Sequence, residues 1–567
     1  MKTLDPALAG DLASRNMAGA LFDTLLQYNY TRRPYVLEPS MLARMPEMRE
    51  GGASYYFELR DDLFFVSDPA FGPKGGSKEA RKVRSSDVVF SFLRIADARM
   101  HSPVFWLWRG RVKGIDEFYA ATAAAPAESD YFAEYDRGVA GFEVIDERHF
   151  AIHLTRPDPR FLYNLAIPYT GIVPQRAVRH YGNDRFAEHP VGSGPFYLSA
   201  YRRDYEAVLT RNAEFRTETF PEAQNPADRA RKLPLADRIV CSNIRQSLSA
   251  WLLFLQGELE VSVLNKDNAD LIAGGRELAP ALRRRRIELV THVEFEIQYV
   301  GFSFTDPKLA GNLKLRQALT YAYNIPRRIA LFNDLAVPAA GPIPPGVPGY
   351  APELEKATNC YDLERARLLL REAGYPDGID PATGKPLVLN FDQAGNTSLH
   401  RQLGEMAAAD WSRLGLEIKV NLNNGPRFYQ KLRQGEMQLF RLSWVGDYPD
   451  AENFLQLFYS KNAGGCNRVF YHDAEFDRQF EAILPMADSP ERTARYQAMA
   501  RYLVGQMPWI FESQPVSYQL KHVWMENFIP HDFACNRWKY WSIDPDLKAA
   551  TIRSFRPLSL SELQTAE

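Results

Sequence analysis

The chain has 567 residues, of which 46% are hydrophobic and 24% charged, as expected for a globular protein with two or three packed units. Its 68 basic and 70 acidic residues give a formal net charge of −2, so it lacks the basic excess typical of nucleic-acid-binding proteins. The four cysteines contain no CxxC pair, which excludes a zinc or redox motif of that kind. A single disulfide, considered between Cys466 and Cys535, and unpaired thiols both fit their spacing.

The chain shows no stretch of about 18 consecutive apolar residues, so no membrane-spanning helix is predicted. The first residues, MKTLDPALAG, contain no apolar core of a signal peptide. A literal interpretation of this start predicts a cytoplasmic protein, whereas a truncated start leaves export open.

In the first third, residues 54–66 alternate in polarity and predict a strand pair turning at Asp61 and Asp62. Ser85 and Ser86 then lie in the N-cap position before a predicted helix, DVVFSFLRIAD. Residues 142–154 predict a hairpin turning at Asp146 and Glu147. His149 and His153 fall on one face of this hairpin without an HExxH context, so a metal site is not favoured.

Residues 192–195, GSGP, lack the spacing of a nucleophile elbow and predict a turn into a strand. Further on, residues 313–328 predict a helix, and a second helix extends from its cap at Asp362 to Gly374. A strand at 387–395, a helix at 400–416 and a strand at 417–422 follow. This alternation is typical of an α/β fold with parallel strand pairing, and two more amphipathic helices are predicted near Phe476 and after Ser489.

These segments, in this order, resemble the family 5 extracellular solute-binding proteins, which include dipeptide- and oligopeptide-binding proteins. The resemblance extends from Thr3 to about Trp524 and is carried by LDPALAGD, ALFDTLLQYN, LEPSMLARMPE, YYFELRDDLFF, VRSSDVVFSFLR, PVGSGPFYL, LFLQGELEV, KLRQALTYAYNIPRR, YDLERARLLLREAGYPDG, LGLEIKV, SWVGDYPDAENFL and QMPWIF.

The resemblance implies an α/β, bilobal, periplasmic-binding-protein-like fold (class II, cluster C type) with an extra subdomain in lobe I. By this likeness lobe I comprises residues 1–41, 165–271 and 516–567, its extra subdomain 42–164, and lobe II 272–515. A hinge and an interlobe cleft are then expected, and hinge closure on the ligand would create the surface that the transporter recognises.

The expected ligand contacts lie in residues 440–455, FRLSWVGDYPDAENFL. In peptide-binding relatives an aspartate three residues after a tryptophan holds the α-ammonium of the peptide, which places this role on Asp447 after Trp444. Arg441 matches an arginine that reaches the ligand's carboxylate end. Trp444 and Tyr448 would line the wall for side chains, Ser303 is a further candidate, and a bound peptide backbone would pair with a strand edge.

The expected function is therefore the extracytoplasmic substrate-binding component of an ABC importer that captures a peptide-like ligand. The expected partners are this solute and a membrane permease, without nucleic acid, and the protein is expected to be a non-enzymatic monomer without a cofactor, periplasmic or lipid-anchored. Val445 and Asn324 depart from the peptide-binding pattern, so an oligosaccharide, opine or nickel chelate stays open as the ligand. A hydrolase or a cytoplasmic ligand sensor is less favoured, because the sequence shows neither a nucleophile or metal arrangement nor a helix-turn-helix.

Overall fold

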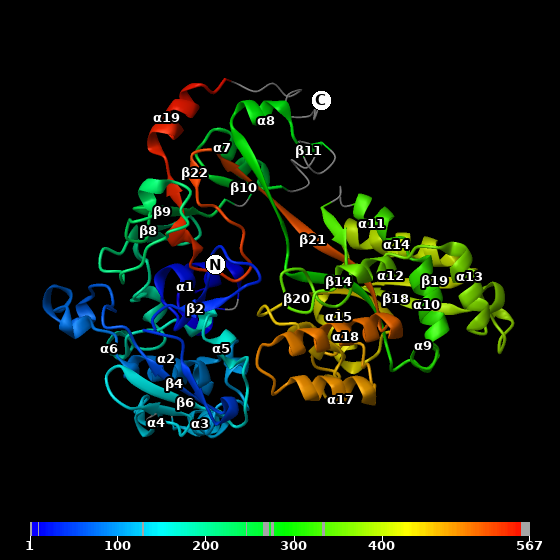
Figure 1. Cartoon of the computed structure of the whole chain (residues 1–567), viewed down its shortest axis with the longest axis horizontal. Coiled ribbons are helices and arrows are strands. Elements are labelled where there is room, and N and C mark those ends of the chain that lie inside the picture. The colour runs from blue at the N-terminus through cyan, green and yellow to red at the C-terminus, as the bar shows by residue number, and fades with distance from the viewer. Residues whose placement is uncertain are drawn as a thin grey trace. The chain divides into compact units, whose positions relative to one another are not determined.

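The computed structural model describes residues 3–9, 11–126, 130–244, 246–264, 272–273, 277–331 and 335–556 (Figure 1). These residues form two compact units. Unit 1 contains the described residues up to Ser262, Arg285–Ile287 and those from Lys521 onward, and unit 2 contains the described residues of Val263–Arg284 and Glu288–Leu520. The chain therefore passes between the units several times, and the strand β21 (Trp509–His522) itself extends across the boundary.

Unit 1 contains a three-stranded antiparallel sheet, β7 (Phe196–Arg202), β8 (Glu206–Arg211) and β9 (Arg238–Ser242). The turn at Gly192–Gly194 leads into β7, as predicted. The helix α1 (Leu12–Leu21), capped by the Asp11 side chain, packs against this sheet. Other elements of unit 1 are β1 (Leu26–Tyr28), β2 (Leu37–Pro39), α3 (Ile115–Ala124), α4 (Ala133–Arg137), α5 (Phe161–Asn164), α6 (Gln175–Tyr181), α7 (Ser247–Leu255), β22 (Met525–Glu526), β23 (Ser542–Ile543) and α19 (Pro545–Arg553).

A second sheet of unit 1 has the order β3-β4-β6-β5, with β3 at Glu47–Arg49, β4 at Ser54–Glu58, β5 at Phe142–Val144 and β6 at His149–His153. The hairpin predicted at residues 142–154 is confirmed as β5–β6. The strand pair predicted within residues 54–66 is wrong, because β4 pairs with β3 and with the distant β6 instead. The buried side chains of β4 find their apolar neighbours across β6, where Phe57 stacks on Phe150.

The helix α2 (Ser85–Ala96) confirms the helix predicted after the two serines. Its N-cap is Arg84 rather than a serine, because the Asp87 carboxylate reaches back to accept a hydrogen bond from the Arg84 backbone N–H at 3.0 Å. Ser85 is instead the first helical residue, and its hydroxyl donates to the backbone oxygen of Asp146 in the β5–β6 turn.

Four charged side chains cluster in unit 1, of which Asp23, Arg216 and Lys539 are buried and Glu218 is partly buried. Arg216 contacts Asp23 and Glu218 at 2.6 Å each, and the Lys539 ammonium lies 2.7 Å from Glu218. Burial alone would raise the pKa of Glu218, but Lys539 and Arg216 lower it to about 2. Glu218 is therefore ionised in the folded protein at all but very acidic pH.

Unit 2 is built on a mixed sheet in which β21, β14 (Glu296–Phe302), β20 (Leu439–Val445), β18 (Val388–Gln393) and β19 (Glu417–Leu422) lie in this order. β18 and β19 pair in parallel through α14 (Ser398–Ser412), which confirms the strand–helix–strand prediction. β10 (Val261–Val263), β13 (Ile287–Val293) and β15 (Ala336–Pro338) pair with β21.

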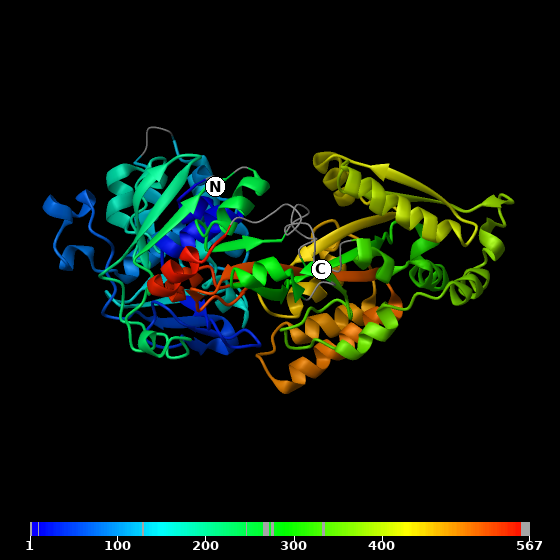
Figure 2. The same ribbon diagram turned by 90° about the horizontal axis from the view of Figure 1, so that it is seen from above.

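Helices cover both faces of this sheet (Figure 2). α10 (Leu313–Ala322), α13 (Leu363–Glu372) and α14 share a buried core with Val300, Leu439 and Ile510 of the strands. α17 (Ala474–Ile483) and α18 (Pro490–Gln506) lie on the opposite side, where Tyr299 stacks on Trp509 with ring centroids 3.5 Å apart. Alternate residues of each strand therefore face different helix layers.

The helix predicted from Asp362 shows how local signals determine an element. The Asp362 carboxylate accepts a hydrogen bond from the Arg365 backbone N–H at 2.9 Å, and Gly374 ends the helix with a φ of 92°. Its buried apolar stripe consists of Ala366, Leu369 and Leu370, and Ala373 beside them is partly buried. Other elements of unit 2 are β11 (Ile272–Ala273), β12 (Glu277–Leu278), α8 (Pro280–Arg284), α9 (Pro307–Ala310), α11 (Ile325–Leu331), α12 (Glu355–Thr358), β16 (Ile379–Asp380), β17 (Lys385–Pro386), α15 (Gly425–Gln434) and α16 (Glu452–Leu455).

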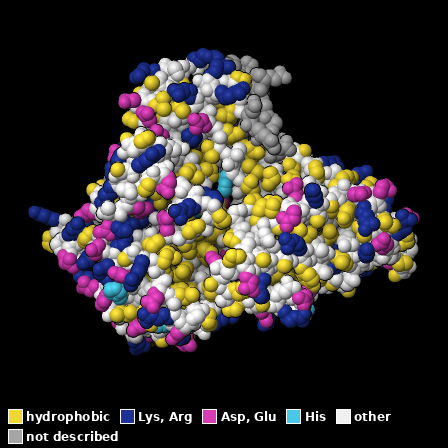
Figure 3. All heavy atoms as spheres, viewed as in Figure 1, with side chains coloured by type: hydrophobic (Ala, Val, Ile, Leu, Met, Phe, Trp, Pro, Cys, Tyr) yellow, Lys and Arg dark blue, Asp and Glu magenta, His cyan; other side chains and the backbone are white. Residues whose placement is uncertain are grey.

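All four cysteines lie among the described residues and are free thiols, so the disulfide considered between Cys466 and Cys535 is not formed. Within the described part of the chain, no helix combines the length and apolar character needed to cross a bilayer. Figure 3 shows basic and acidic side chains interspersed over the visible face of the described residues, in keeping with the net charge of −2.

Candidate ligand-binding site

The strand β20 carries two of the predicted contact residues, Arg441 and Trp444, and lies inside the sheet of unit 2. β14 pairs with it along its whole length, from Phe302 opposite Leu439 to Glu296 opposite Val445. On the other side, β18 pairs with it only at Leu439 and Phe440. Among the described strands, none pairs with this second edge at residues 441–445, so the edge is open in the sense that its backbone groups have no strand partner there.

Arg441 forms an ion pair with Glu512 of β21. Its Nη2 lies 2.7 Å from the Glu512 Oε1 and donates to the Gln298 side-chain oxygen at 2.6 Å, while its Nε donates to the same carboxylate at 3.0 Å. Burial alone would raise the pKa of Glu512, but Arg441 lowers it below its ordinary value. Arg441 therefore already has a carboxylate partner within the protein, and its Nη1 takes no part in these contacts.

This ion pair continues into a larger buried polar cluster. The Tyr323 hydroxyl donates to the second oxygen of Glu512 at 2.5 Å, and the Arg328 guanidinium lies 3.4 Å from the Tyr323 ring centroid. Arg328 in turn contacts Asp410 at 2.6 Å. Because the cluster joins β20 and β21 to α10, α11 and α14, it fixes the position of Arg441 in the sheet.

Trp444 and Asp447 meet at one side chain, that of Asn453. The Asn453 oxygen accepts hydrogen bonds from the Trp444 indole N–H at 3.0 Å and from the Asp447 backbone N–H at 3.2 Å. The Asn453 amide also lies 3.5 Å from the Asp447 carboxylate. Asp447 is exposed, so the structure places its carboxylate on the surface of the turn that follows the open strand edge.

Tyr448 is buried in the same turn, and its hydroxyl donates to Glu452 at 2.6 Å. The neighbouring Asp450 accepts a hydrogen bond from Tyr496 and lies 2.9 Å from Arg492, both on α18. The turn is therefore tied to a long helix, which holds the exposed Asp447 in place. Because Tyr448 is buried, it supports the turn from beneath in this structure.

Ser303 lies away from these residues. It follows Phe302, whose partner on β20 is Leu439, so it is at the opposite end of the strand from Trp444. Ser303 is only 1% exposed, and its hydroxyl forms a hydrogen bond with the Thr305 hydroxyl at 2.8 Å. The structure thus brings Asp447, Trp444 and Tyr448 together, places Arg441 three residues earlier on the same strand, and does not bring Ser303 to them.

The sequence analysis missed Glu512, Gln298 and Asn453. Gln298 lies within a strand that is otherwise largely apolar, and Glu512 directly follows the apolar residues 509–511. Such polar residues require partners when buried. This signal indicates a buried polar contact, but it does not identify a partner 71 residues away. No sequence feature distinguished Asn453, because other polar residues lie close to it in the sequence and a single polar residue does not stand out among them.

The described residues hold no cluster of three or more potential metal ligands. His149 and His153 do share one side of β6, but each has its own carboxylate, Asp146 at 2.9 Å and Glu143 at 3.1 Å. The turn and the strand edge together present a partly unpaired backbone, the Asp447 carboxylate and the Trp444 ring.

Residues 36–466 match the family described as bacterial extracellular solute-binding proteins, family 5, which is more than half of the chain. The chain belongs to this family. Its members are non-catalytic solute-binding proteins, and the chain is accordingly the substrate-binding protein of an ABC importer.

Among similar curated proteins, heme-binding protein A of Haemophilus influenzae (strain ATCC 51907 / DSM 11121 / KW20 / Rd) is 25% identical over 90% of this chain and 84% of its own length. Di/tripeptide-binding protein 1 of Pseudomonas aeruginosa (strain UCBPP-PA14) is 25% identical over 87% of this chain and 82% of its own length. The solved structure of HbpA2 from Haemophilus parasuis aligns with a TM-score of 0.75 and 22% identity over 96% of this chain and 98% of that one. The predicted periplasmic-binding-protein fold is thereby confirmed.

Proposed function

We propose that this solute-binding protein captures a peptide-like solute with a free α-ammonium group, and that Asp447 binds this ammonium. The observation that carries the proposal is the exposed Asp447 carboxylate, held by Asn453 directly after the open edge of β20. An extended peptide can pair its backbone with such an edge, and its terminal ammonium then needs an anionic partner nearby.

Trp444 and Arg441 have secondary roles in this proposal. Trp444 offers an aromatic surface beside the turn, and Arg441 contributes the Nη1 of its guanidinium to a ligand carboxylate. The Glu512 carboxylate neutralises much of the Arg441 charge, so this contact contributes less affinity than the one at Asp447. The similarity to a di/tripeptide-binding protein supports a short peptide as the ligand.

We further propose that the protein works outside the cytoplasmic membrane, periplasmic or lipid-anchored, and delivers its solute to a membrane permease as a monomer. The family, which is extracellular, supports this location. The division of the chain into lobe I at 1–41, 165–271 and 516–567, its extra subdomain at 42–164 and lobe II at 272–515 belongs to the same proposal.

The test is isothermal titration calorimetry of the whole chain with di- to pentapeptides and with the same peptides N-acetylated. Removing a charge-assisted contact costs roughly 1.5–3 kcal/mol, so Asp447→Asn should weaken binding of free-amine peptides by roughly 10- to 100-fold. N-acetylation should weaken wild-type binding in the same way and should add little to the loss in Asp447→Asn. The matched control is Asp61→Asn, which removes an equal charge from an exposed position in unit 1.

Heme is the second candidate ligand, because heme-binding protein A aligns over 90% of the chain. The same titration is therefore repeated with heme, glutathione, an oligosaccharide, an opine and a nickel chelate. Binding of one of the ligands that have no α-ammonium, with no response to any peptide, would contradict the peptide proposal and leave the family assignment in place.

A further inference from the structure

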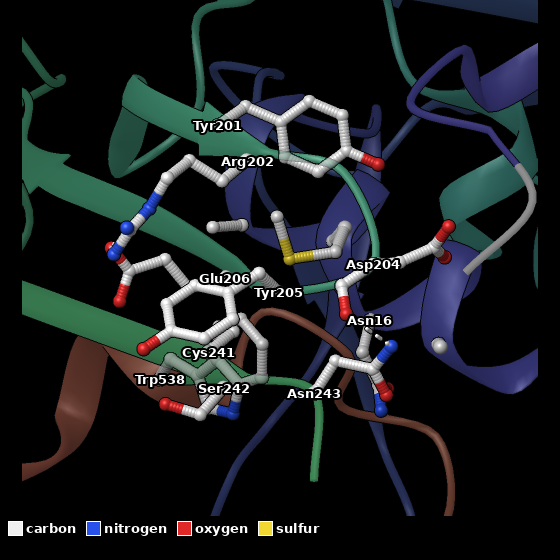
Figure 4. Close-up of a pocket in the computed structure, with 13 residues that line it drawn as sticks. Asn16, Tyr201, Arg202, Asp204, Tyr205, Glu206, Cys241, Ser242, Asn243 and Trp538 are labelled. Atoms are coloured by element: carbon white, nitrogen blue, oxygen red, sulfur yellow. Dashed lines mark hydrogen bonds and ion pairs between the residues drawn. The ribbon is translucent and has the colours of Figure 1, made fainter. Parts of the chain in front are cut away.

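Unit 1 contains a cavity of about 280 Å³ that the proposed peptide contacts do not use (Figure 4). It lies between α1, the β7–β8 hairpin, the end of β9 and the short helical turn at Arg537–Tyr540. Its lining combines aromatic rings, sulfur-containing side chains and a few polar groups. The main residues are Asn16, Met17, Tyr201, Tyr205, Cys241 and Trp538.

Two tyrosine rings lie on different sides of the cavity and keep much of their surface accessible. Tyr205 is 60% exposed and Tyr201 is 41% exposed. Large aromatic surfaces left in contact with water are available for stacking, and aromatic pairs contribute beyond their buried area. The rings therefore form accessible walls for a flat ligand.

The hairpin that carries Tyr205 is fixed in place. The Arg202 guanidinium lies 4.2 Å from the Tyr205 ring centroid and forms an ion pair with Glu206. Asn243, which follows β9, donates its backbone N–H to the backbone carbonyl of Tyr205 at 2.8 Å. Its side-chain amide donates to the backbone carbonyl of Asp204 at 3.1 Å. A wall held in this way loses little conformational freedom when a ligand binds.

The lining combines apolar and polar side chains, and one of its polar groups is an unsatisfied acceptor. Met17 is buried, and burial raises the pKa of the Cys241 thiol to about 11, so the thiol is neutral at physiological pH. The Asn16 side-chain oxygen is buried and accepts no hydrogen bond from any described residue. A buried acceptor without a donor is unfavourable, and a ligand that supplies an N–H or O–H relieves this cost.

We propose that this cavity binds an aromatic ring that carries an N–H or O–H donor, such as an indole or a phenol. The ring stacks against Tyr201 and Tyr205, and its donor meets the Asn16 oxygen. The cavity is at the small end of ligand sites, which fits one ring system rather than a large cofactor. This site is separate from the Asp447 turn, and its proposal does not depend on the peptide function.

The first test uses two probes on the whole chain, indole and 1-methylindole, measured by ligand-observed NMR titration. Indole should bind with a dissociation constant in the millimolar range, as expected for a fragment. 1-Methylindole has the same ring but no donor, and it should bind about tenfold more weakly. Equal binding of the two probes, or no binding of indole, would overturn the proposal without any substitution in the protein.

The second test locates the site with four variants. Tyr201→Ala and Tyr205→Ala should each weaken indole binding at least about fivefold, since stacking is lost. Tyr197→Ala is the matched control, because Tyr197 is 38% exposed on the same strand β7 but does not line the cavity. Asn16→Ala should remove the preference for indole over 1-methylindole. Indole binding that is unchanged in both tyrosine variants, with melting curves showing native folds, would contradict this location.

Discussion

The ion pair between Arg441 and Glu512 leads to a quantitative prediction for Glu512→Gln. The Glu512 side chain is 1% exposed and that of Arg441 is 15% exposed, so the substitution leaves a mostly buried guanidinium without its counter-charge. Breaking a buried ion pair from one side costs about 3–5 kcal/mol. Because Gln298 still accepts from Arg441 and the new amide retains an oxygen, we expect the lower end, about 3 kcal/mol.

For a unit of this size, 1 kcal/mol corresponds to about 2–4 °C, so the melting temperature should fall by about 6–12 °C. The assay is thermal unfolding followed by circular dichroism, together with urea unfolding. The pKa of Glu512 is held below its unfolded value, so the pair stabilises the wild type above that unfolded pKa and loses its contribution as pH falls through the folded pKa. The stability difference between wild type and Glu512→Gln should therefore shrink in acid.

The control is the double variant Arg441→Leu with Glu512→Leu. Replacing both members of a buried ion pair by apolar side chains is often nearly neutral, so this variant should be more stable than Glu512→Gln. A double-mutant cycle should give a coupling of about 2 kcal/mol or more between the two positions. A loss below about 1 kcal/mol in Glu512→Gln, or additive effects in the cycle, would refute the reasoning.

Three further perturbations test other parts of the structure. The pKa of Glu218 is lowered to about 2, so urea unfolding should show stability declining as pH falls from about 4.3 toward 2, with a smaller decline in Glu218→Gln. Burial lowers the pKa of His522 to about 4, so the free energy of unfolding should also fall as pH drops from about 6.5 to 4. If His522→Phe lost stability over this pH range as steeply as the wild type, the role given to His522 would be contradicted. In Gly446→Ala the new Cβ would lie 2.0 Å from the Phe295 ring, so melting should show a loss of about 1–3 kcal/mol, and an unchanged melting temperature would show that the ring moves freely.

Much of the fold could be predicted because its signals are local. The helix from Asp362 has its cap, its apolar stripe and its terminating glycine within a few residues of one another. The strands β18 and β19 are both close to the helix that connects them, so their parallel pairing follows from chain order. The strand pair predicted at residues 54–66 was wrong because β4 pairs with β3 on its N-terminal side and with β6, about a hundred residues away, and polarity patterns do not identify strand partners.

The candidate site shows the same limit. Asp447, Trp444 and Tyr448 are neighbours in sequence, so one segment was enough to bring them together. The environment of Arg441 depends on Glu512, which reaches it only through the pairing of β14 with both β20 and β21. Ser303 is near the same strands, but register places it at the far end, and register is set by the whole sheet rather than by the local sequence.

The open edge of β20 also affects how the protein avoids self-association. Unpaired backbone groups at a sheet edge attract extended segments of other chains, and long flat edges promote aggregation. Here the open stretch covers only residues 441–445 and ends in the turn that carries the charged Asp447. A short edge bordered by a carboxylate can pair with one brief segment but offers little to a growing stack of strands. The feature that carries the peptide proposal is thus also one that, by its shortness and its charge, disfavours edge-to-edge association of the empty protein.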